Sequence, residues 1–392
     1  MEQPEGYPEP GKEDWVWELQ KGLYGMKQGG RVWNKTMNDA MLEWGFTRLP
    51  CEYCIYYRRT DTGIILTGVH VDDFISVGSD PAENERFKAQ LRTKWKISDL
   101  GQIKYCIGIA IERNRSNRTV ALSQTALIDR VVTQFGQRDS HPITTPMDAG
   151  LQLSRASHLK LSPTQKREVA ALPYRSLVGC LMYLSIGTRP DIALPVQQLS
   201  QFLDCYSYDH WEAAKRVVRY LKGTRTYKLH LGGTPITTLS GFSDSNFGTC
   251  VDTRRSTSGY CFSLGSGLIS WAARKQKTVS TSTCEAEYIA CSEATKELMW
   301  LRALLLGLDH PQLKPTVLSC DNNGALQLTS DPSFHSRTKH IDIRHHYIHE
   351  CVSNGSLTVK YINTHDNLAD AFTKPLVAKP FVRFRSLMGV LP

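Results

Sequence analysis

Residues 316–321 read Thr-Val-Leu-Ser-Cys-Asp, a short apolar run that ends on a carboxylate. A run of this length, rich in apolar residues, predicts a buried strand. Asp321 therefore closes a core strand, which is where sheets with helices after their strands place ligand-facing groups. Asp321 could also cap the helix that we expect to begin at Asn322, and both roles can hold together.

The sequence on either side of this strand predicts a mixed sheet. Before it, we expect strands at 239–247, 258–264 and 267–273 and a long helix at 283–306. After it, we expect helices near 322–329 and 338–352, a strand at 357–362 and a final helix at 366–374. Three consecutive strands, a helix and then alternating strands and helices predict an α/β (α+β) fold with helices on the faces of the sheet.

Three further carboxylates stand in comparable settings. Asp244 lies in the first expected strand, within Gly-Phe-Ser-Asp-Ser-Asn-Phe, where an unpaired carboxylate would be costly unless a cation meets it. Asp370 opens the final helix and either completes a site or is a first-turn acid favoured by the helix dipole. A hydrolase that uses two metal ions needs acidic side chains from several elements at one edge of a sheet. We therefore predict a site for two divalent ions formed by Asp244, Glu287, Asp321 and Asp370.

The fourth member of this set is chosen between two glutamates at the start of the long helix. Ser282-Thr-Cys-Glu285 fits a capping box, in which Glu285 folds back on the first amide of the helix. Glu287 instead shares a face with Cys291 and Leu298, the apolar side expected to pack on the sheet. A carboxylate on that side is anomalous unless a metal meets it, so Glu287 is favoured.

Basic residues gather in two further stretches. Residues 335–349 contain several histidines but lack the glutamate of a zinc hydrolase motif, so we expect a basic helix that contacts nucleic acid through Arg337, Lys339 and Arg344. After a polar connection at 138–172, helices are expected at 174–185, 191–203 and 208–222. The basic side of the last helix could be a solvated face or a contact for backbone phosphates, and the sequence leaves these two open.

The N-terminal part predicts a helix and an acidic hairpin. Residues 22–46 indicate a helix entered through a glycine turn, followed by strands at 54–57 and within 64–77. Asp72 and Asp73 stand between the two apolar strands of that last stretch. Neighbouring aspartates repel each other, so a metal-binding hairpin is favoured over a solvated turn.

Length, charge and cysteine content limit the classes of protein to which the chain can belong. The 392 residues suit two or three globular domains, and their formal charge of +9 arises outside residues 236–378, where basic and acidic residues balance. This distribution favours contact with nucleic acid. Eleven cysteines at irregular spacings indicate buried thiols in a reducing compartment, and the lone C-x-x-C of Cys51 and Cys54 is a weak zinc signal. With no signal peptide and no membrane span, we expect an intracellular, cytoplasmic protein, with a virus-like particle or the nucleus as alternatives.

Several long motifs in a fixed order resemble the Pol polyprotein of copia-type LTR retrotransposons. They are Tyr-Arg-Ser-Leu-Val-Gly-Cys-Leu-Met-Tyr-Leu (174–184), Thr-Arg-Pro-Asp-Ile-Ala (188–193), His-Trp-Glu-Ala-Ala-Lys-Arg (210–216), Arg-Arg-Ser-Thr-Ser-Gly-Tyr (254–260), His-Ser-Arg-Thr-Lys-His-Ile-Asp-Ile-Arg (335–344) and Leu-Ala-Asp-Ala-Phe-Thr-Lys-Pro-Leu (368–376). The resemblance implies reverse transcriptase sequence first and ribonuclease H sequence last. We expect a reverse transcriptase palm and thumb at 1–147, a linker and helical connection at 148–238, a ribonuclease H domain at 239–378 and a basic tail at 379–392.

For the first domain, the resemblance places Gln28 and Arg31 near template or incoming nucleotide. It identifies Asp72 and Asp73 as the polymerase metal-binding hairpin, although His70 stands where the family usually has tyrosine. The third polymerase aspartate and the fingers belong to sequence upstream of Met1. We therefore expect negligible RNA-directed DNA polymerase activity from this chain, or activity only when another chain supplies the missing part.

For the last domain, the resemblance implies endonucleolytic cleavage of RNA in RNA–DNA hybrids with Mg²⁺, or Mn²⁺ in its place. Asp244 would bridge both ions, with Glu287 and Asp321 completing one and Asp370 the other. Ser245, Asn246 and Asn322 are the candidates for contacts to ribose 2′-hydroxyls. The expected partners are RNA–DNA hybrids, template RNA or DNA, and other Pol or Gag products, with no membrane. The alternative is an inactive relic that binds nucleic acid without cutting it.

Overall fold

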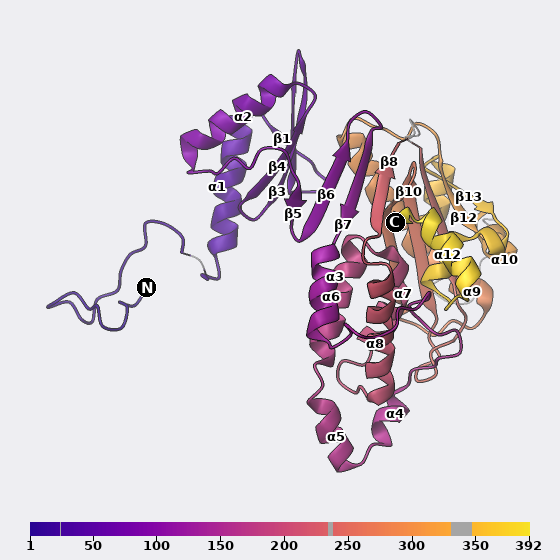
Figure 1. Ribbon diagram of the computed structural model, residues 1–392. Coiled ribbons are helices and arrows are strands. Elements are labelled where there is room, and N and C mark those ends of the chain that lie inside the picture. The colour runs from indigo at the N-terminus through magenta and orange to yellow at the C-terminus, as the bar shows by residue number, and fades with distance from the viewer. Residues whose placement is uncertain (24, 234–237, 331–346) are drawn as a thin grey trace. The chain divides into compact units, whose positions relative to one another are not determined.

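The computed structural model describes residues 1–23, 25–233, 238–330 and 347–392 (Figure 1). The chain divides into two compact units, Met1–Gly101 and Gln102–Pro392.

The first unit is an antiparallel sheet with two helices. The elements are α1 (Gly29–Glu43), β1 (Thr47–Arg48), β2 (Ile55–Thr60), β3 (Gly63–His70), β4 (Asp73–Gly78) and α2 (Pro81–Lys94), and the strands follow in sequence order. The expected hairpin within 64–77 is therefore present. The helix expected at 22–46 is shorter, because α1 begins only at Gly29. Met41, Tyr56, Ile65 and Phe87 pack together in the core between helices and sheet.

The second unit contains a helical layer built on three long helices. These helices are α3 (Thr125–Gln134), α6 (Tyr174–Gly187) and α8 (Tyr208–Gly223), and the short η1 (Pro190–Ile192) and α7 (Ala193–Ser200) connect α6 to α8. Their apolar sides form one core that includes Val131, Leu181 and Val217. The polar connection expected at 138–172 contains two short helices, α4 (Arg155–Leu159) and α5 (Pro163–Ala170).

The basic side of α8 binds the protein's own backbone. Arg219 Nε donates to the His141 carbonyl at 2.8 Å, and Lys222 Nζ donates to the Ser140 carbonyl at 2.7 Å. Arg216 lies 3.7 Å from the Asp148 carboxylate. The sequence left open a solvated face and a contact for backbone phosphates, and the structure shows a third role, because these side chains hold residues 138–148 against the helix.

A small antiparallel sheet joins distant parts of the second unit. Its strand order is β14-β8-β7-β6-β5, from β14 (Val390–Leu391), β8 (Lys228–Gly232), β7 (Thr119–Ser123), β6 (Ile109–Asn114) and β5 (Tyr105–Cys106). The basic residues after 378 are therefore part of the fold, since α12 (Ala378–Leu387) precedes β14.

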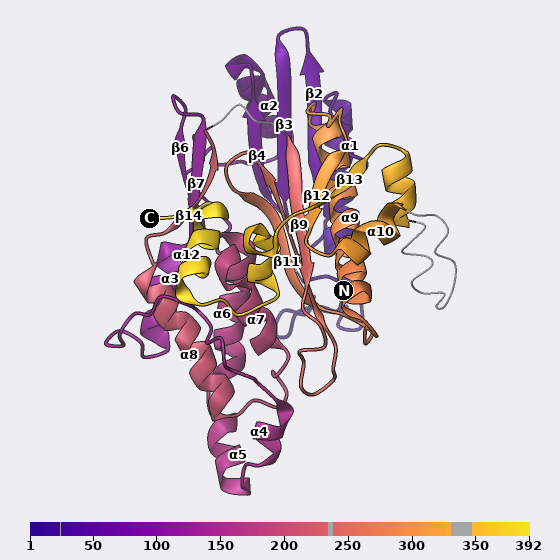
Figure 2. The ribbon, with the colours of Figure 1, turned by 90° about the vertical axis from the view of Figure 1, so that its right-hand side faces the viewer.

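The mixed sheet predicted from the sequence is confirmed. Its strand order is β11-β10-β9-β12-β13, formed by β9 (Leu239–Ser245), β10 (Thr257–Leu264), β11 (Leu268–Lys275), β12 (Thr316–Cys320) and β13 (Leu357–Tyr361). β9, β10 and β11 pair antiparallel, whereas β12 runs parallel to both β9 and β13 (Figure 2). This arrangement places the carboxyl ends of β9 and β12 at the same edge.

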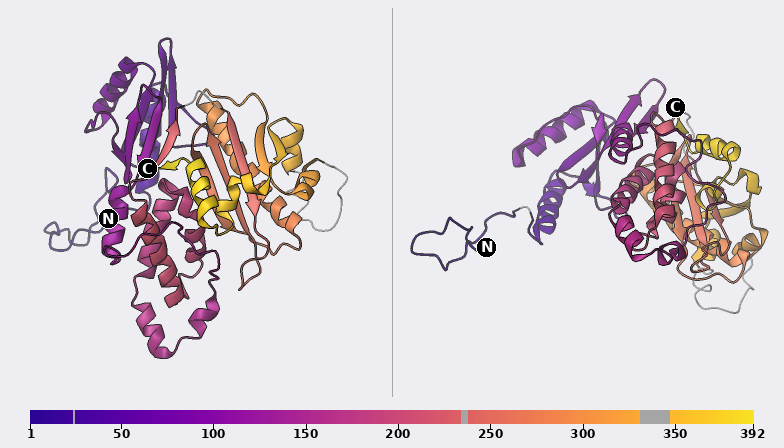
Figure 3. Two further views of the ribbon diagram at one scale, coloured as in Figure 1. Left: turned by 45° about the vertical axis from the view of Figure 1, so that its right-hand side comes forward. Right: turned by 60° about the horizontal axis from the view of Figure 1, so that its bottom comes forward.

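Helices cover both faces of this sheet. α9 (Thr283–Gly307) and α10 (Asn323–Ser330) pack with Phe262 and Leu318 on one face. On the other face, Cys261 packs with Phe372 and with Phe384 of α12. The C-terminal helix α12 is drawn in yellow in Figure 3. Residues 347–353 are also helical, whereas the rest of the helix expected at 338–352 lies outside the described residues.

The prediction of a single helix at 366–374 is wrong. The structure has two short 3-10 helices instead, η2 (Thr364–Asp366) and η3 (Leu368–Phe372). Asn363 and Asn367 cap them with their side chains, and such local hydrogen bonds compete with a continuous α-helix.

All eleven cysteines are free thiols. Among the described residues, no single helix is long and apolar enough to cross a membrane, although α5 and α6, bent by 44°, pass that test as a pair.

Candidate metal centre

Asp244 and Asp321 meet at one edge of the mixed sheet because their strands are parallel. Phe242 of β9 pairs with Ser319 of β12, so two residues further along each strand the two aspartates lie at the same level. Asp370 of η3 joins them, and one carboxylate oxygen from each aspartate lies within 4.8 Å of the other two. Asp244 is completely buried and Asp370 is 7% exposed. The fold therefore concentrates three carboxylates away from solvent.

Glu287 reaches the same edge from the N-terminal part of α9, just after its first turn. Its ligand atom lies within 4.8 Å of those of Cys320 and Asp321. The residue is 6% exposed, and its Oε2 atom has no hydrogen-bond partner among the described residues. Burial, followed by repulsion from Asp244, raises the pKa of Glu287 far above its ordinary value. A carboxylate in this position is stable in its ionised form only beside a cation.

Glu285 has the separate structural duty that was expected of it. The Ser282 hydroxyl accepts from the Glu285 amide at 3.1 Å, which caps α9. The Glu285 carboxylate folds back, although it accepts from the amide and hydroxyl of Thr281 rather than from Ser282.

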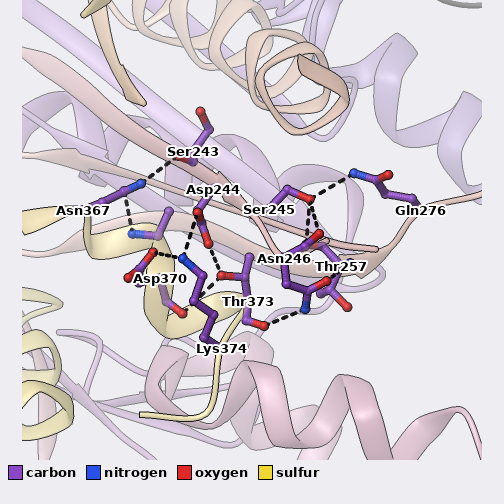
Figure 4. Close-up of polar contacts among 11 residues, drawn as sticks. Ser243, Asp244, Ser245, Asn246, Thr257, Gln276, Asn367, Asp370, Thr373 and Lys374 are labelled. Atoms are coloured by element: carbon purple, nitrogen blue, oxygen red, sulfur yellow. Dashed lines mark hydrogen bonds and ion pairs between the residues drawn. The ribbon is translucent and has the colours of Figure 1, made fainter. Parts of the chain in front are cut away.

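Lys374 and Thr373 follow η3 and contact the cluster directly (Figure 4). Lys374 Nζ lies 2.9 Å from Asp370 Oδ1 and 3.4 Å from Asp244 Oδ1. The Thr373 hydroxyl donates to Asp244 Oδ2. Burial, and then the Asp244 carboxylate, raise the pKa of Asp370 to about 7, while Lys374 opposes this rise. The ammonium therefore offsets part of the negative charge.

Two asparagines fasten η3 to β9. Asn367 Nδ2 donates to the Ser243 carbonyl at 3.0 Å, and Asn246 Nδ2 donates to the Thr373 carbonyl at 2.8 Å. Asn246 Oδ1 accepts from the Thr257 amide at 2.7 Å (Figure 4). Both ends of the Asn246 side chain are thus used within the protein.

The residues expected to contact ribose have structural duties. Ser245 is 7% exposed and hydrogen-bonds through Oγ to the Thr257 carbonyl and to Gln276. Asn322 Oδ1 accepts from the Ala325 amide at 3.0 Å, so Asn322, and not Asp321, caps α10. The Ser245 hydroxyl and the Asn246 side chain are therefore both engaged within the protein. Arg337, Lys339 and Arg344 lie outside the described residues.

The chemistry of the cluster fits a hard divalent cation. Mg²⁺ prefers carboxylate oxygens, and the buried, unpartnered Oε2 of Glu287 supplies one where only a cation would compensate it. Asp244, Glu287, Asp321 and Asp370 are the residues that would hold such ions. Sequence reasoning missed Cys320, Thr373 and Lys374. The i, i+4 spacing of Asp370 and Lys374 was a usable signal, because it brings opposite charges together in helical turns.

The acidic hairpin of the first unit has a different setting. Asp72 and Asp73 are exposed at the β3–β4 turn, where His70 pairs with Asp73. Val71 adopts φ 57°, an uncommon conformation for a β-branched residue, and its carbonyl accepts from Trp33 Nε1 at 2.5 Å. Gln28, which precedes α1, and Arg31, in its first turn, are also exposed.

The fold and the cluster define a mixed helix-and-sheet protein with a buried carboxylate centre suited to divalent cations. A family model described as "Reverse transcriptase (RNA-dependent DNA polymerase)" matches residues 1–149. The Pol polyprotein of transposon TNT 1-94 from Nicotiana tabacum is 39% identical over the whole chain, and that of transposon RE1 from Arabidopsis thaliana is 36% identical. A putative transposon Ty5-1 protein of Saccharomyces cerevisiae is 32% identical, over 76% of this chain and 94% of its own length. The chain belongs to the Pol family of copia-type retrotransposons, as the motifs predicted.

The chain spans 29% and 26% of the two plant polyproteins. Among solved structures, a foamy viral protease-reverse transcriptase in complex with RNA/DNA hybrid is 12% identical, with a TM-score of 0.44 over 87% of this chain and 39% of that one. An LC11-RNase H1 is 13% identical, with a TM-score of 0.28 over 35% of this chain and 93% of that one.

Proposed function

We propose that the mixed-sheet part of this chain is a ribonuclease H, which cleaves the RNA strand of RNA–DNA hybrids with Mg²⁺ and leaves a 3′-hydroxyl and a 5′-phosphate. The observation that carries the proposal is the convergence of Asp244, Asp321 and Asp370 within 4.8 Å, with Glu287 beside Asp321. Membership of the Pol family supports hybrid as the substrate, because such elements copy RNA into DNA.

Bound Mg²⁺ would lower the pKa of water and stabilise negative charge on the leaving oxygen. The protein's own contribution is to hold the carboxylates rigidly. Asp244 is fixed by its strand and by Thr373, whereas Asp370 is fixed by the two asparagines that fasten η3 to β9. Residues locked in this way by hydrogen bonds and packing keep ligand geometry within narrow limits.

The difference in burial among the carboxylates of the cluster also suits catalysis. A completely buried Asp244 and a nearly buried Glu287 interact with a cation in surroundings that screen charge weakly. Asp321 is only partly buried, so solvent and substrate can approach the cluster from its side.

The proposal is tested with a purified 392-residue chain and a hybrid labelled on either strand. We expect Mg²⁺-dependent cuts in the RNA strand alone, and no cuts in single-stranded RNA or in the DNA strand. Asp321→Asn should bind hybrid with unchanged affinity and fail to cut it. Binding without cutting by the wild-type protein at all Mg²⁺ and Mn²⁺ concentrations would establish the relic instead.

A further inference from the structure

We propose that Lys374 is an internal cation that occupies the position between Asp244 and Asp370, so that an ion binds there only after the ammonium has moved away. The two ions of the site would then bind with unequal affinity. This inference rests on the metal centre of the proposed function.

The distances show why the ammonium and an ion exclude each other. Lys374 Nζ lies 2.9 Å from one oxygen of Asp370 and 3.4 Å from one oxygen of Asp244. Mg²⁺ binds carboxylate oxygens at 2.0–2.1 Å. An ion held by those same two oxygens would lie in the space of the ammonium, and two cations at such short range repel strongly.

The ligand atoms of Asp244 are already engaged. Lys374 contacts Oδ1, and the Thr373 hydroxyl donates to Oδ2. Asp370 Oδ1 likewise accepts from Lys374. Binding of an ion between these two aspartates therefore requires an exchange of partners, rather than simple addition to open oxygens.

The side of the cluster near Glu287 is different. Among the described residues, Glu287 Oε2 lacks a hydrogen-bond partner and neither Glu287 nor Asp321 forms an ion pair, whereas Asp244 and Asp370 both pair with Lys374. The first ion should therefore bind beside Glu287 and Asp321, where it displaces no protein cation. The second ion should bind at the position of Lys374.

Lys374 can leave without unfolding its surroundings. Its side chain is 38% exposed, whereas those of Asp244 and Asp370 are 0% and 10% exposed. Its backbone amide donates to the Asp370 carbonyl at 2.9 Å, so the main chain stays fixed while the four-carbon side chain rotates toward solvent.

The test is to measure the affinity of the whole chain for Mn²⁺ by calorimetry and by electron paramagnetic resonance. The wild-type protein should bind one ion tightly and one weakly. Lys374→Met should tighten the weak site about tenfold, which corresponds to about 1.4 kcal/mol, and Lys374→Arg should leave it weak. Lys314→Met is the matched control, because Lys314 is exposed at the opposite end of β12 and loses the same charge.

A second measurement needs no variant. The rate at which an amine-reactive reagent modifies Lys374 should rise as the second Mn²⁺ ion binds, whereas the rate at Lys314 stays constant. Equal Mn²⁺ affinities in wild type and Lys374→Met, or an unchanged modification rate at Lys374, would overturn the inference. Failure of every variant to bind any Mn²⁺ would instead overturn the metal centre itself.

Discussion

The two acidic motifs of this chain differ sharply in burial. Asp72 and Asp73 are exposed on a hairpin turn of the first unit, so water solvates both. Asp244, Glu287 and Asp370 of the second unit are less than a tenth exposed and come from three separate elements. Charge that is buried and unbalanced must be met by a proton, a lysine or a metal ion. The second motif therefore depends on a cation for its stability, and the first does not.

The largest effect that this comparison predicts is on cleavage of hybrid. Asp244→Asn removes a carboxylate from the centre of the cluster, and we expect cleavage to fall roughly 10³-fold, the scale for losing a principal electrostatic contact. Asp73→Asn changes the other motif and should leave the cleavage rate within about twofold. A strand-labelled hybrid with Mg²⁺ gives both rates. Similar losses in the two variants would remove the distinction between the motifs.

Removal of the metal should lower the stability of the second unit. Ions at 100 times their dissociation constant add about 2.7 kcal/mol, which corresponds to a rise of roughly 5 °C in melting temperature. Differential scanning calorimetry with Mg²⁺ and with EDTA measures this rise. Asp321→Asn should abolish it and Asp72→Asn should retain it. A rise that survives Asp321→Asn would place the stabilising ion elsewhere.

The stability of the metal-free protein should fall as pH rises from about 4 to 7. The pKa of Asp370 is raised to about 7 when folded, so unfolding in this range releases a proton, and its favourable contribution is lost as pH increases. We expect Asp370→Asn to flatten this part of the profile in EDTA. Mg²⁺ should reverse the trend, because it binds the ionised carboxylates. An identical slope in wild type and Asp370→Asn would contradict the assignment.

The smallest effect concerns the exposed motif. Trp33→Phe removes the hydrogen bond to the Val71 carbonyl but keeps an aromatic ring, and should cost about 1 kcal/mol in the β3–β4 hairpin. Hydrogen exchange at the amides of β3 and β4 measures this loss. Exchange in the mixed sheet should not change, and faster exchange there would show that the substitution acts more widely.

The strands of the mixed sheet could be predicted because each carries its own apolar pattern. The positions of Asp321 and Asp244 follow from this pattern. Their strands, β12 and β9, are parallel neighbours, so the carboxyl ends of both strands lie at one edge of the sheet. The choice of Glu287 over Glu285 followed from helix periodicity, and the structure buries Glu287 and leaves Glu285 at the cap.

Other features depend on contacts between distant residues and left no local signal. β8 pairs with both β7 and β14 across more than a hundred residues, which no single stretch of sequence reveals. The basic side of α8 was ambiguous because its carbonyl partners lie in the preceding connection. The 3-10 helices near Asp370 are short because asparagine side chains cap each of them locally. The helical pattern of the sequence therefore predicted one longer helix in place of two short ones.

The most direct test of the central claim locates the bound ion along the chain. Fe²⁺ replaces Mg²⁺, ascorbate and peroxide generate hydroxyl radicals at the ion, and mass spectrometry identifies the cut peptide bonds. We predict cuts next to Asp244, Glu287, Asp321 and Asp370 at low Fe²⁺, suppressed by Mg²⁺, and none at Asp72 and Asp73. Cuts at the exposed hairpin before any in the mixed sheet would contradict the account.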